Sequence, residues 1–156
     1  MDLREMSTPA LAYLGDCVLE LCVREYLVES GFSTSRNLNA QALNFVRASA
    51  QAEAMKYIRA GVSGRDADKV ARDVITDAGY GAYFGHSLGH SLGLEIHELP
   101  SVSPKSEAIL VSGNIVTVEP GIYIPGKYGV RIENMVLVTD DGCINLTNSE
   151  RQLIEL

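Results

Sequence analysis

Residues 115–139 read IVTVEPGIYIPGKYGVRIENMVLVT, and this stretch decides the fold class. Two runs rich in β-branched residues, 115–123 and 130–139, predict strands. Pro125-Gly126 predicts a turn after the first run, and Asp140-Asp141-Gly142 predicts a turn after the second. Strands joined by turns this short run antiparallel. We therefore expect an antiparallel sheet in the C-terminal part of the chain.

A further strand is expected just upstream, over residues 92–98. Its residues alternate, with Leu94 and Ile96 on one face and Glu95 and His97 on the other. This alternation is typical of a strand that is buried on one side only.

The N-terminal part of the chain predicts helices instead. A first helix ends at Ser30-Gly31, a second covers about 39–58, and a third covers 65–78 and ends at Gly79. Because helices precede an antiparallel sheet, the fold class is α+β, with N-terminal helices packed on a mostly antiparallel C-terminal sheet.

The first of these helices has apolar residues on most of its sides. A chain of 156 residues has limited core in which to bury them, and large exposed apolar patches are uncommon on monomers. We therefore expect a homo-oligomer, a dimer or larger. The apolar residues concerned are Leu11, Leu14, Leu19, Val23 and Leu27.

The composition indicates a globular protein and excludes a disordered or a membrane protein. With 46% apolar and 21% charged residues, the chain is of the globular type, and its length suits one domain or two small pieces that share a core. The net charge is −7. Residues 1–60 contain seven acidic and six basic residues, whereas residues 61–156 contain thirteen and seven. The acidic second part favours cation binding, so a nucleic acid partner is not expected.

The sequence also indicates a compartment. It contains no apolar run close to the roughly 20 residues that span a bilayer, and its N-terminus does not resemble a signal peptide. Cys17, Cys22 and Cys143 are an odd number of cysteines without metal-site spacing, as expected of reduced thiols. We expect a cytoplasmic protein without a membrane partner.

Candidate site residues concentrate in the second part. His86, His90 and His97 are the only histidines and lie within twelve residues of one another. Glu119 and Glu133 each lie in one of the two predicted strands. Singly, a histidine is more often a surface or core residue, and alternation permits each glutamate to face solvent. Together, a histidine and two carboxylates on three elements of one sheet could bind a divalent ion such as Mn, Co or Zn.

Arg131 adds a positive charge beside this set. It lies two residues before Glu133, so both side chains point to the same face of a strand. From there the guanidinium could hold a carboxylate in place by a charge-assisted hydrogen bond.

Four stretches of the second part match the sequence of a known family: IRAGVSGRDADKVARDVITDAGYG (58–81), YFGHSLGHSLGLEIHE (83–98), VTVEPGIYIPG (116–126) and GVRIENMVLVTDDG (129–142). They resemble the pita-bread metallopeptidases, and in particular the Xaa-Pro peptidases among them. The resemblance implies a partial pita-bread fold, and metal binding by His90, Glu119 and Glu133, with Glu133 bridging two ions. It implies that His97 stabilises the tetrahedral intermediate, that His86 lies beside the substrate, and that the substrate is a proline-containing peptide.

One departure from that family limits the expected chemistry. The family's other metal ligands are two aspartates in a glycine-rich hairpin, upstream of the turn that resembles residues 61–64. Upstream of Gly61 this sequence has only Asp2 and Asp16, in regions predicted to be helical or next to a helix. The aspartates of the third helix, such as Asp68, are expected on its polar surface. We therefore expect one weakly bound divalent ion and little or no peptidase activity.

The N-terminal part resembles a different family. TPALAYLGDCVLELCVREYLVESGFS (8–33) and NAQALNFVRASAQAEAMKYI (39–58) are similar to the start of Mini-ribonuclease III. The resemblance implies that Asp16 is a catalytic, metal-binding carboxylate. Glu20, one turn later, could share its face or be solvated. The glutamate that would complete that site has no counterpart in the sequence, and one carboxylate cannot hold the magnesium ions of phosphodiester hydrolysis.

Taken together, the two resemblances describe a chimera-like, recombined chain. Residues 1–57 form the Mini-ribonuclease III-like segment, and residues 58–156 form the metallopeptidase-like domain. The leading interpretation is a partial Xaa-Pro peptidase metal site with little activity. The alternatives are a folded oligomer without catalysis and a Mini-ribonuclease III-like RNA-processing protein.

Overall fold

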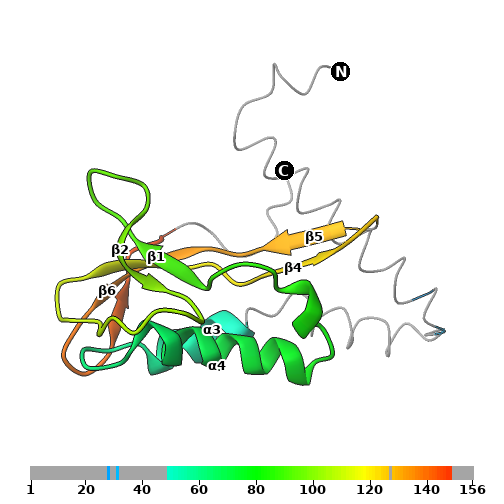
Figure 1. Ribbon diagram of the computed structural model, residues 1–156, viewed down its shortest axis with the longest axis horizontal. Coiled ribbons are helices and arrows are strands. Elements are labelled where there is room, and N and C mark those ends of the chain that lie inside the picture. The colour runs from blue at the N-terminus through cyan, green and yellow to red at the C-terminus, as the bar shows by residue number, and fades with distance from the viewer. Residues whose placement is uncertain (1–27, 29–30, 32–48, 127, 149–156) are drawn as a thin grey trace, which may run out of the picture. The chain divides into compact units, whose positions relative to one another are not determined.

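The computed structural model describes residues 28, 31, 49–126 and 128–148 (Figure 1). Residues 49–124 and 129–148 belong to one compact unit, which is described here by itself. The first predicted helix and most of the second lie outside the described residues. Asp16, Cys17 and Cys22 lie outside them too.

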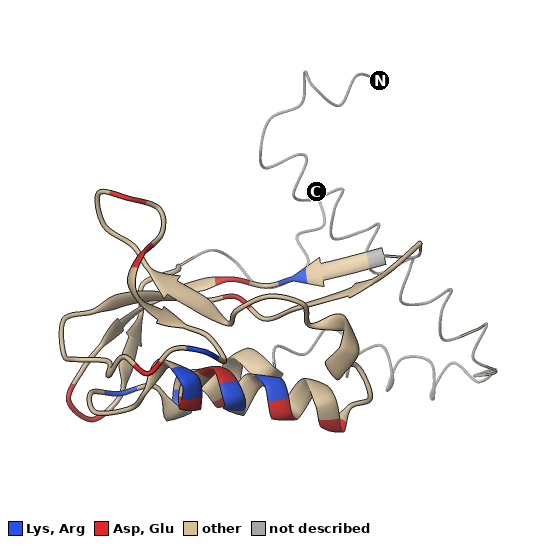
Figure 2. Ribbon diagram, viewed as in Figure 1, with Lys and Arg blue, Asp and Glu red and all other residues tan. Residues whose placement is uncertain are grey.

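Two helices open this unit, α3 (Ser49–Tyr57) and α4 (Gly64–Asp77). Ser63 caps α4: its hydroxyl oxygen accepts the backbone N–H of Asp66 at 3.0 Å. The helix ends before Gly79, whose φ of +88° suits a residue without a side chain. The predicted third helix is therefore confirmed, and α3 is the C-terminal part of the predicted second helix. Charged residues of both signs occur along α4, as the blue and red segments of its ribbon show (Figure 2).

Five antiparallel strands form the main sheet, in the order β2-β1-β3-β6-β7. β3 pairs with β6 so that Thr117 lies opposite Met135 and Val118 opposite Asn134. The α+β prediction, helices on a mostly antiparallel sheet, is confirmed (Figure 1). The bounds are β1 Gly89–Ser91, β2 Glu98–Val102, β3 Ile115–Val118, β6 Asn134–Val138 and β7 Cys143–Asn145; a 3₁₀ turn, η2, spans Gly81–Tyr83.

Each of the two long predicted strands is divided. The first is broken at Glu119-Pro120 into β3 and β4 (Gly121–Ile124), and the second at Ile132-Glu133 into β5 (Tyr128–Arg131) and β6. β4 and β5 pair with each other in a separate two-stranded sheet. Pro120 has no N–H to donate, which helps to end the first ladder. Both candidate glutamates therefore lie where the chain passes between the two sheets.

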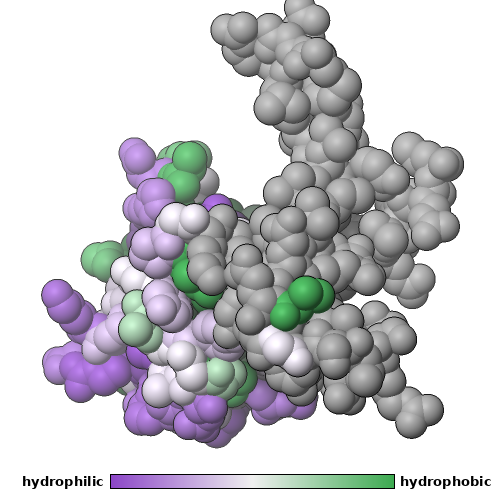
Figure 3. All heavy atoms as spheres, turned by 90° about the vertical axis from the view of Figure 1, so that its right-hand side faces the viewer, coloured by the Kyte–Doolittle hydropathy of each residue, from purple (hydrophilic) through white to green (hydrophobic). Residues whose placement is uncertain are grey.

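The predicted strand over 92–98 is wrong. These residues form the loop that joins β1 to β2, and only Glu98 is in a strand. The loop is held by its own contacts, because the Glu98 carboxylate accepts the N–H of Glu95 at 2.9 Å. Leu94 and Ile96 are fully and three-quarters exposed instead of sharing a buried face. Figure 3 shows hydrophobic residues, in green, among the hydrophilic ones on one face of the molecule.

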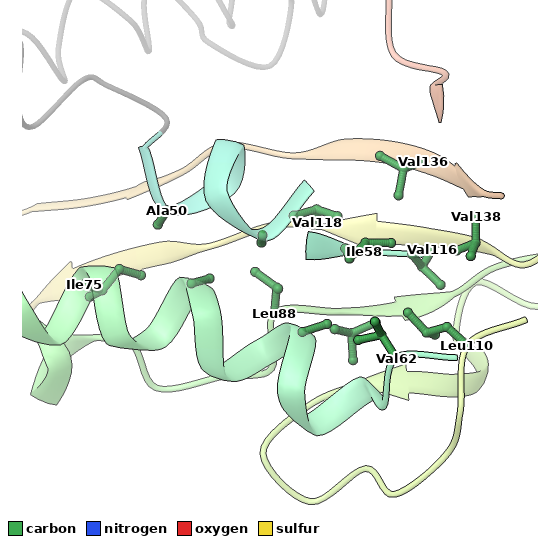
Figure 4. Packing of buried hydrophobic residues seen from close by; sticks show 14 of the residues in the cluster. Ala50, Ile58, Val62, Ile75, Leu88, Leu110, Val116, Val118, Val136 and Val138 are labelled. Carbon is green, nitrogen blue, oxygen red and sulfur yellow. The ribbon is translucent and has the colours of Figure 1, made fainter. Parts of the chain in front are cut away.

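The core lies between the helices and one face of the main sheet (Figure 4). A fully buried valine, leucine or isoleucine side chain contributes about 1.5–3 kcal/mol to the free energy of unfolding. One buried polar residue also fastens α3 to the sheet: Gln51 donates to the Val118 carbonyl at 2.8 Å and accepts from Asn134 at 3.2 Å. The largest fully buried apolar residues are Ile58, Leu88, Leu110, Val102, Val116, Val118, Val136 and Val138.

Candidate metal centre

Residues from four strands and from the loop between β1 and β2 line one pocket of about 420 Å³. His90 comes from β1, Glu119 directly follows β3, and Glu133 directly precedes β6. The structure thus brings the three predicted ligands to one pocket. Its other lining residues are His97, Thr117, Arg131, Leu92, Ile96 and Met135.

His90 and Glu119 face each other across this pocket. The His90 Nε2 atom lies 3.3 Å from Glu119 Oε1. The other ring nitrogen, Nδ1, lies 3.0 Å from the Ser91 carbonyl oxygen, and since a carbonyl only accepts, Nδ1 carries the proton. In the neutral ring Nε2 is then an acceptor, and it faces a carboxylate oxygen that is also an acceptor. A proton or a metal ion between the two atoms would remove this conflict.

Thr117 connects these two residues. Its hydroxyl lies 2.9 Å from Glu119 Oε1 and 3.0 Å from the backbone nitrogen of His90. This residue was not among the candidates predicted from the sequence. The available signal was its position two residues before Glu119, which places both on one face of a strand.

Arg131 lies between the two carboxylates. Its Nε atom is 3.7 Å from Glu119 Oε2, and its Nη2 atom is 3.6 Å from Glu133 Oε2. These separations are those of ion pairs and exceed hydrogen-bond length. Arg131 is therefore a charge partner of the carboxylates. It does not form the predicted hydrogen bond, and it does not share one strand with Glu133, because β5 ends at Arg131 and β6 begins at Asn134.

The donor types of this pocket fit a divalent cation. Imidazole nitrogen and carboxylate oxygen are ligands of Zn, Mn and Co. Among the residues that the structure describes, however, no three His, Cys, Asp or Glu side chains already converge on one point. Two donors are adjacent, and the third, Glu133, shares the pocket while paired with Arg131. The assignment of the three as ligands stays a prediction.

The remaining two histidines are placed differently. The ring of His97 packs on that of His90, with centroids 4.3 Å apart and planes inclined by 51°. His86 is outside the pocket lining and contacts Tyr123, whose hydroxyl lies 3.2 Å from His86 Nε2. Of the two histidines proposed as catalytic, His97 lines the pocket and His86 does not.

Asp68 corrects one expectation of the sequence analysis. We expected it on the polar surface of the third helix, but its side chain is only 1% exposed. It accepts two hydrogen bonds from Arg72, at 2.7 and 3.0 Å, and one from the backbone N–H of Leu88 at 2.9 Å. Three partners satisfy this buried charge, so Asp68 is part of the framework behind the site.

Asp16 and Glu20, the candidate residues of the Mini-ribonuclease III-like segment, lie outside the described residues. Among the helices that the structure describes, none has both the length and the apolar character needed to span a membrane.

Comparison with known proteins identifies the family. The sequence pattern of metallopeptidase family M24 matches residues 22–140. That range crosses residue 58 and includes residues 22–57, which we assigned to the Mini-ribonuclease III-like segment. The boundary between the two segments stays a prediction.

Individual relatives agree with this family assignment. The chain is 49% identical over 105 residues to an Xaa-Pro dipeptidase of Pyrococcus furiosus and 51% identical over 107 residues to YqhT of Bacillus subtilis, an uncharacterized peptidase. These matches cover 67% and 69% of this chain, but only 30% of each relative.

Solved structures confirm a partial pita-bread fold. An Xaa-Pro dipeptidase from Bacillus anthracis superposes with a TM-score of 0.69 at 48% identity, covering 76% of this chain and 33% of that one. The prolidase from Pyrococcus furiosus superposes with a TM-score of 0.66 at 47% identity. The chain spans about a third of the length of these relatives, and it belongs to metallopeptidase family M24.

Proposed function

We propose that this chain contributes a histidine and two glutamates to the divalent-metal site of an Xaa-Pro peptidase-like protein. His90, Glu119 and Glu133 would bind one Mn, Co or Zn ion weakly. The observation that carries the proposal is the 3.3 Å approach of His90 Nε2 to Glu119 Oε1. Two acceptor atoms this close favour a cation between them, and the pocket that holds them also contains Glu133.

The substrate class follows from the relatives. Several are Xaa-Pro dipeptidases by name, so we propose a proline-containing peptide as the ligand of this pocket. A bound divalent ion would supply Lewis-acid polarisation of the peptide carbonyl. His97, packed on His90 at the pocket, would stabilise the oxyanion of the tetrahedral intermediate. His86 would approach the substrate from its place beside Tyr123.

We propose that hydrolysis by these 156 residues alone is weak or absent. They supply three side chains for one ion, and Arg131 already compensates part of their negative charge. The alternative is therefore a folded oligomer without catalysis. The proposed metal-binding chain binds a divalent ion at this pocket, whereas the oligomer would not. The recombined origin, the Mini-ribonuclease III-like role of Asp16, the homo-oligomer and the cytoplasmic location also stay proposals from the sequence.

Metal-dependent melting of the full chain tests the proposal. A ligand that binds only the folded state stabilises it by about 2.7 kcal/mol at a hundredfold excess over Kd. Millimolar Mn²⁺ or Co²⁺ should therefore raise the melting temperature. His90→Ala and Glu133→Gln should abolish the rise, whereas Glu107→Gln, which removes an exposed carboxylate paired with Arg65, should retain it.

The same experiment can contradict the proposal. Equal shifts in the wild type and in the His90 and Glu133 variants would show that the ions bind elsewhere. No shift in the wild type would leave the oligomer without catalysis as the better description. Release of proline from an Xaa-Pro dipeptide at the rate of a competent enzyme would refute the weak-activity part.

A further inference from the structure

Thr117 is buried at the centre of the site, with only 3% of its surface exposed. It lies on β3, and its hydroxyl oxygen is within hydrogen-bond distance of two groups that belong to candidate ligands. These are the Glu119 carboxylate, at 2.9 Å, and the backbone N–H of His90, at 3.0 Å. The contacts join residues on different strands, so the hydroxyl lies at a junction of the site.

The direction of each hydrogen bond follows from the chemistry of the partners. The backbone N–H of His90 can only donate, so the Thr117 oxygen accepts there. The hydroxyl proton is then left for another acceptor. The carboxylate at 2.9 Å is closer than the His90 carbonyl oxygen at 3.4 Å, and it is charged. The proton therefore points to Glu119 Oε1, the oxygen that also faces His90 Nε2.

The backbone leaves little freedom at this junction. β1 approaches β3 so closely that a Cβ atom on Gly89 would lie 1.9 Å from the Thr117 carbonyl oxygen. The N–H of Glu119 is bonded in turn to the Leu88 carbonyl at 2.8 Å. With both strands fixed, the remaining freedom of the Glu119 carboxylate is rotation about its side-chain bonds, and the Thr117 hydroxyl restrains that rotation.

We propose that Thr117 is a positioning residue, whose hydroxyl holds the Glu119 carboxylate facing His90. Its effect on metal affinity rests on the function proposed above, but its effect on Glu119 and His90 does not. Groups that orient a metal ligand through a hydrogen bond typically change metal affinity by about 10- to 100-fold when they are removed. The residue acts through Glu119, without a role as a ligand.

Two variants separate the hydroxyl from the shape of the side chain. Thr117→Val keeps the branched shape and removes the hydroxyl, whereas Thr117→Ser keeps the hydroxyl and removes the methyl group. Thr76→Val is the matched control, since it removes a hydroxyl from α4 whose bond goes to the Arg72 carbonyl. Should Thr117→Val fail to fold, Thr117→Ala takes its place with the same expectation.

The first measurement is Mn²⁺ affinity by titration calorimetry on the folded full chain. Thr117→Val should weaken binding by about 10- to 100-fold, while Thr117→Ser and Thr76→Val stay within roughly threefold of the wild type. Unchanged affinity in Thr117→Val would overturn the proposal. Equal weakening in Thr117→Ser would also overturn it, because the lost methyl group would then be responsible.

The second measurement needs no metal. Amide hydrogen exchange reports whether the N–H of His90 has an acceptor. Thr117→Val should reduce the protection of this N–H by about tenfold, and Thr117→Ser should retain it. Equal protection in both variants would refute the positioning role. If wild-type protein does not bind Mn²⁺, the proposed function fails, and this exchange measurement still decides the role of Thr117.

Discussion

The carboxylate of Asp68 accepts the backbone N–H of Leu88 at 2.9 Å, and this bond joins α4 to the segment that leads into β1. Arg72 strengthens the connection: it pairs with Asp68 and also donates to the carbonyl oxygens of Phe84 and His86, at 3.0 and 2.9 Å. Its guanidinium lies over the Phe84 ring, 4.2 Å from the centroid. One helical turn thus fixes residues 84–88, which precede His90.

Asp68→Asn should destabilise the fold. The substitution leaves Arg72 without its charge partner in a largely buried place, and breaking a buried pair typically costs about 3–5 kcal/mol. We expect a loss near the lower end of that range, because Arg72 is a quarter exposed and keeps its two carbonyl acceptors. Urea unfolding measures the loss. Asp73→Asn, which removes an exposed partner of Lys69 on the same helix, should not move the midpoint of urea unfolding. Equal shifts of the midpoint in Asp68→Asn and Asp73→Asn would contradict the framework role of Asp68.

Gly89→Ala should also destabilise the fold, for a different reason. The new Cβ atom would meet the backbone carbonyl of Thr117, which cannot move without separating β1 from β3. Overpacking of this kind costs about 1–3 kcal/mol, and it should weaken metal binding by displacing His90. Gly85→Ala is the control, since its Cβ would meet nothing within 4 Å. Similar urea midpoints for the two alanine variants would show that β1 can yield at this point.

The sequence predicted elements whose signals are local. The helix over 65–78 was recognisable from its apolar spacing and from Gly79, and α4 has nearly those bounds. The loop over 92–98 was not recognisable as a loop, because alternating apolar and polar residues indicate a strand only where the backbone is extended. Here the Glu98 carboxylate accepts the N–H of Glu95 and closes a turn. That contact depends on side-chain geometry, which alternation does not encode.

The same distinction applies to the site. His90 and Glu119 could be proposed from residue type and spacing, and the structure places them 3.3 Å apart. The break at Glu119-Pro120 had a local signal in Pro120, which cannot donate to a ladder. The break at Ile132-Glu133 could not be proposed, because it depends on which strands pair. The buried state of Asp68 depends likewise on the Leu88 N–H, twenty residues away. Strand pairing and a tertiary hydrogen bond therefore set these two features, which the sequence did not predict.

Cys143 gives a pH-dependent prediction. Burial raises the pKa of its thiol above the ordinary value, and the thiol also donates to the Met55 carbonyl at 3.2 Å. The folded protein therefore keeps a proton that the unfolded chain releases. The thiol's contribution to stability is fully present below the unfolded pKa and falls as the pH rises from there towards the folded pKa.

Alkylation kinetics measure this difference. With Cys17 and Cys22 replaced by serine, iodoacetamide should label Cys143 more slowly in the folded protein than in urea at the same alkaline pH, because the thiolate is the reactive form. Equal labelling rates would show that the folded environment leaves the thiol unperturbed.

The last prediction concerns Arg131 and the two carboxylates. Its guanidinium compensates Glu119 and Glu133 from 3.7 and 3.6 Å, so a divalent ion that binds the same carboxylates would meet a positive charge beside it. Arg131→Gln should remove that repulsion and strengthen Mn²⁺ binding. The side chain is half exposed, and charge interactions of half-exposed groups are worth at most about 1 kcal/mol, so the gain should be about fivefold or less.

Calorimetric titration with Mn²⁺ distinguishes this effect from a supporting role. Arg131→Lys, which keeps the positive charge, should bind the ion with nearly wild-type affinity. Raising the salt concentration should reduce the difference between Arg131→Gln and the wild type, because salt screens exposed charges. If Arg131→Gln binds Mn²⁺ more weakly than the wild type, Arg131 orients the carboxylates for the ion and does not compete with it. The 3.6 Å contact with Glu133 would then belong to the metal-binding arrangement itself.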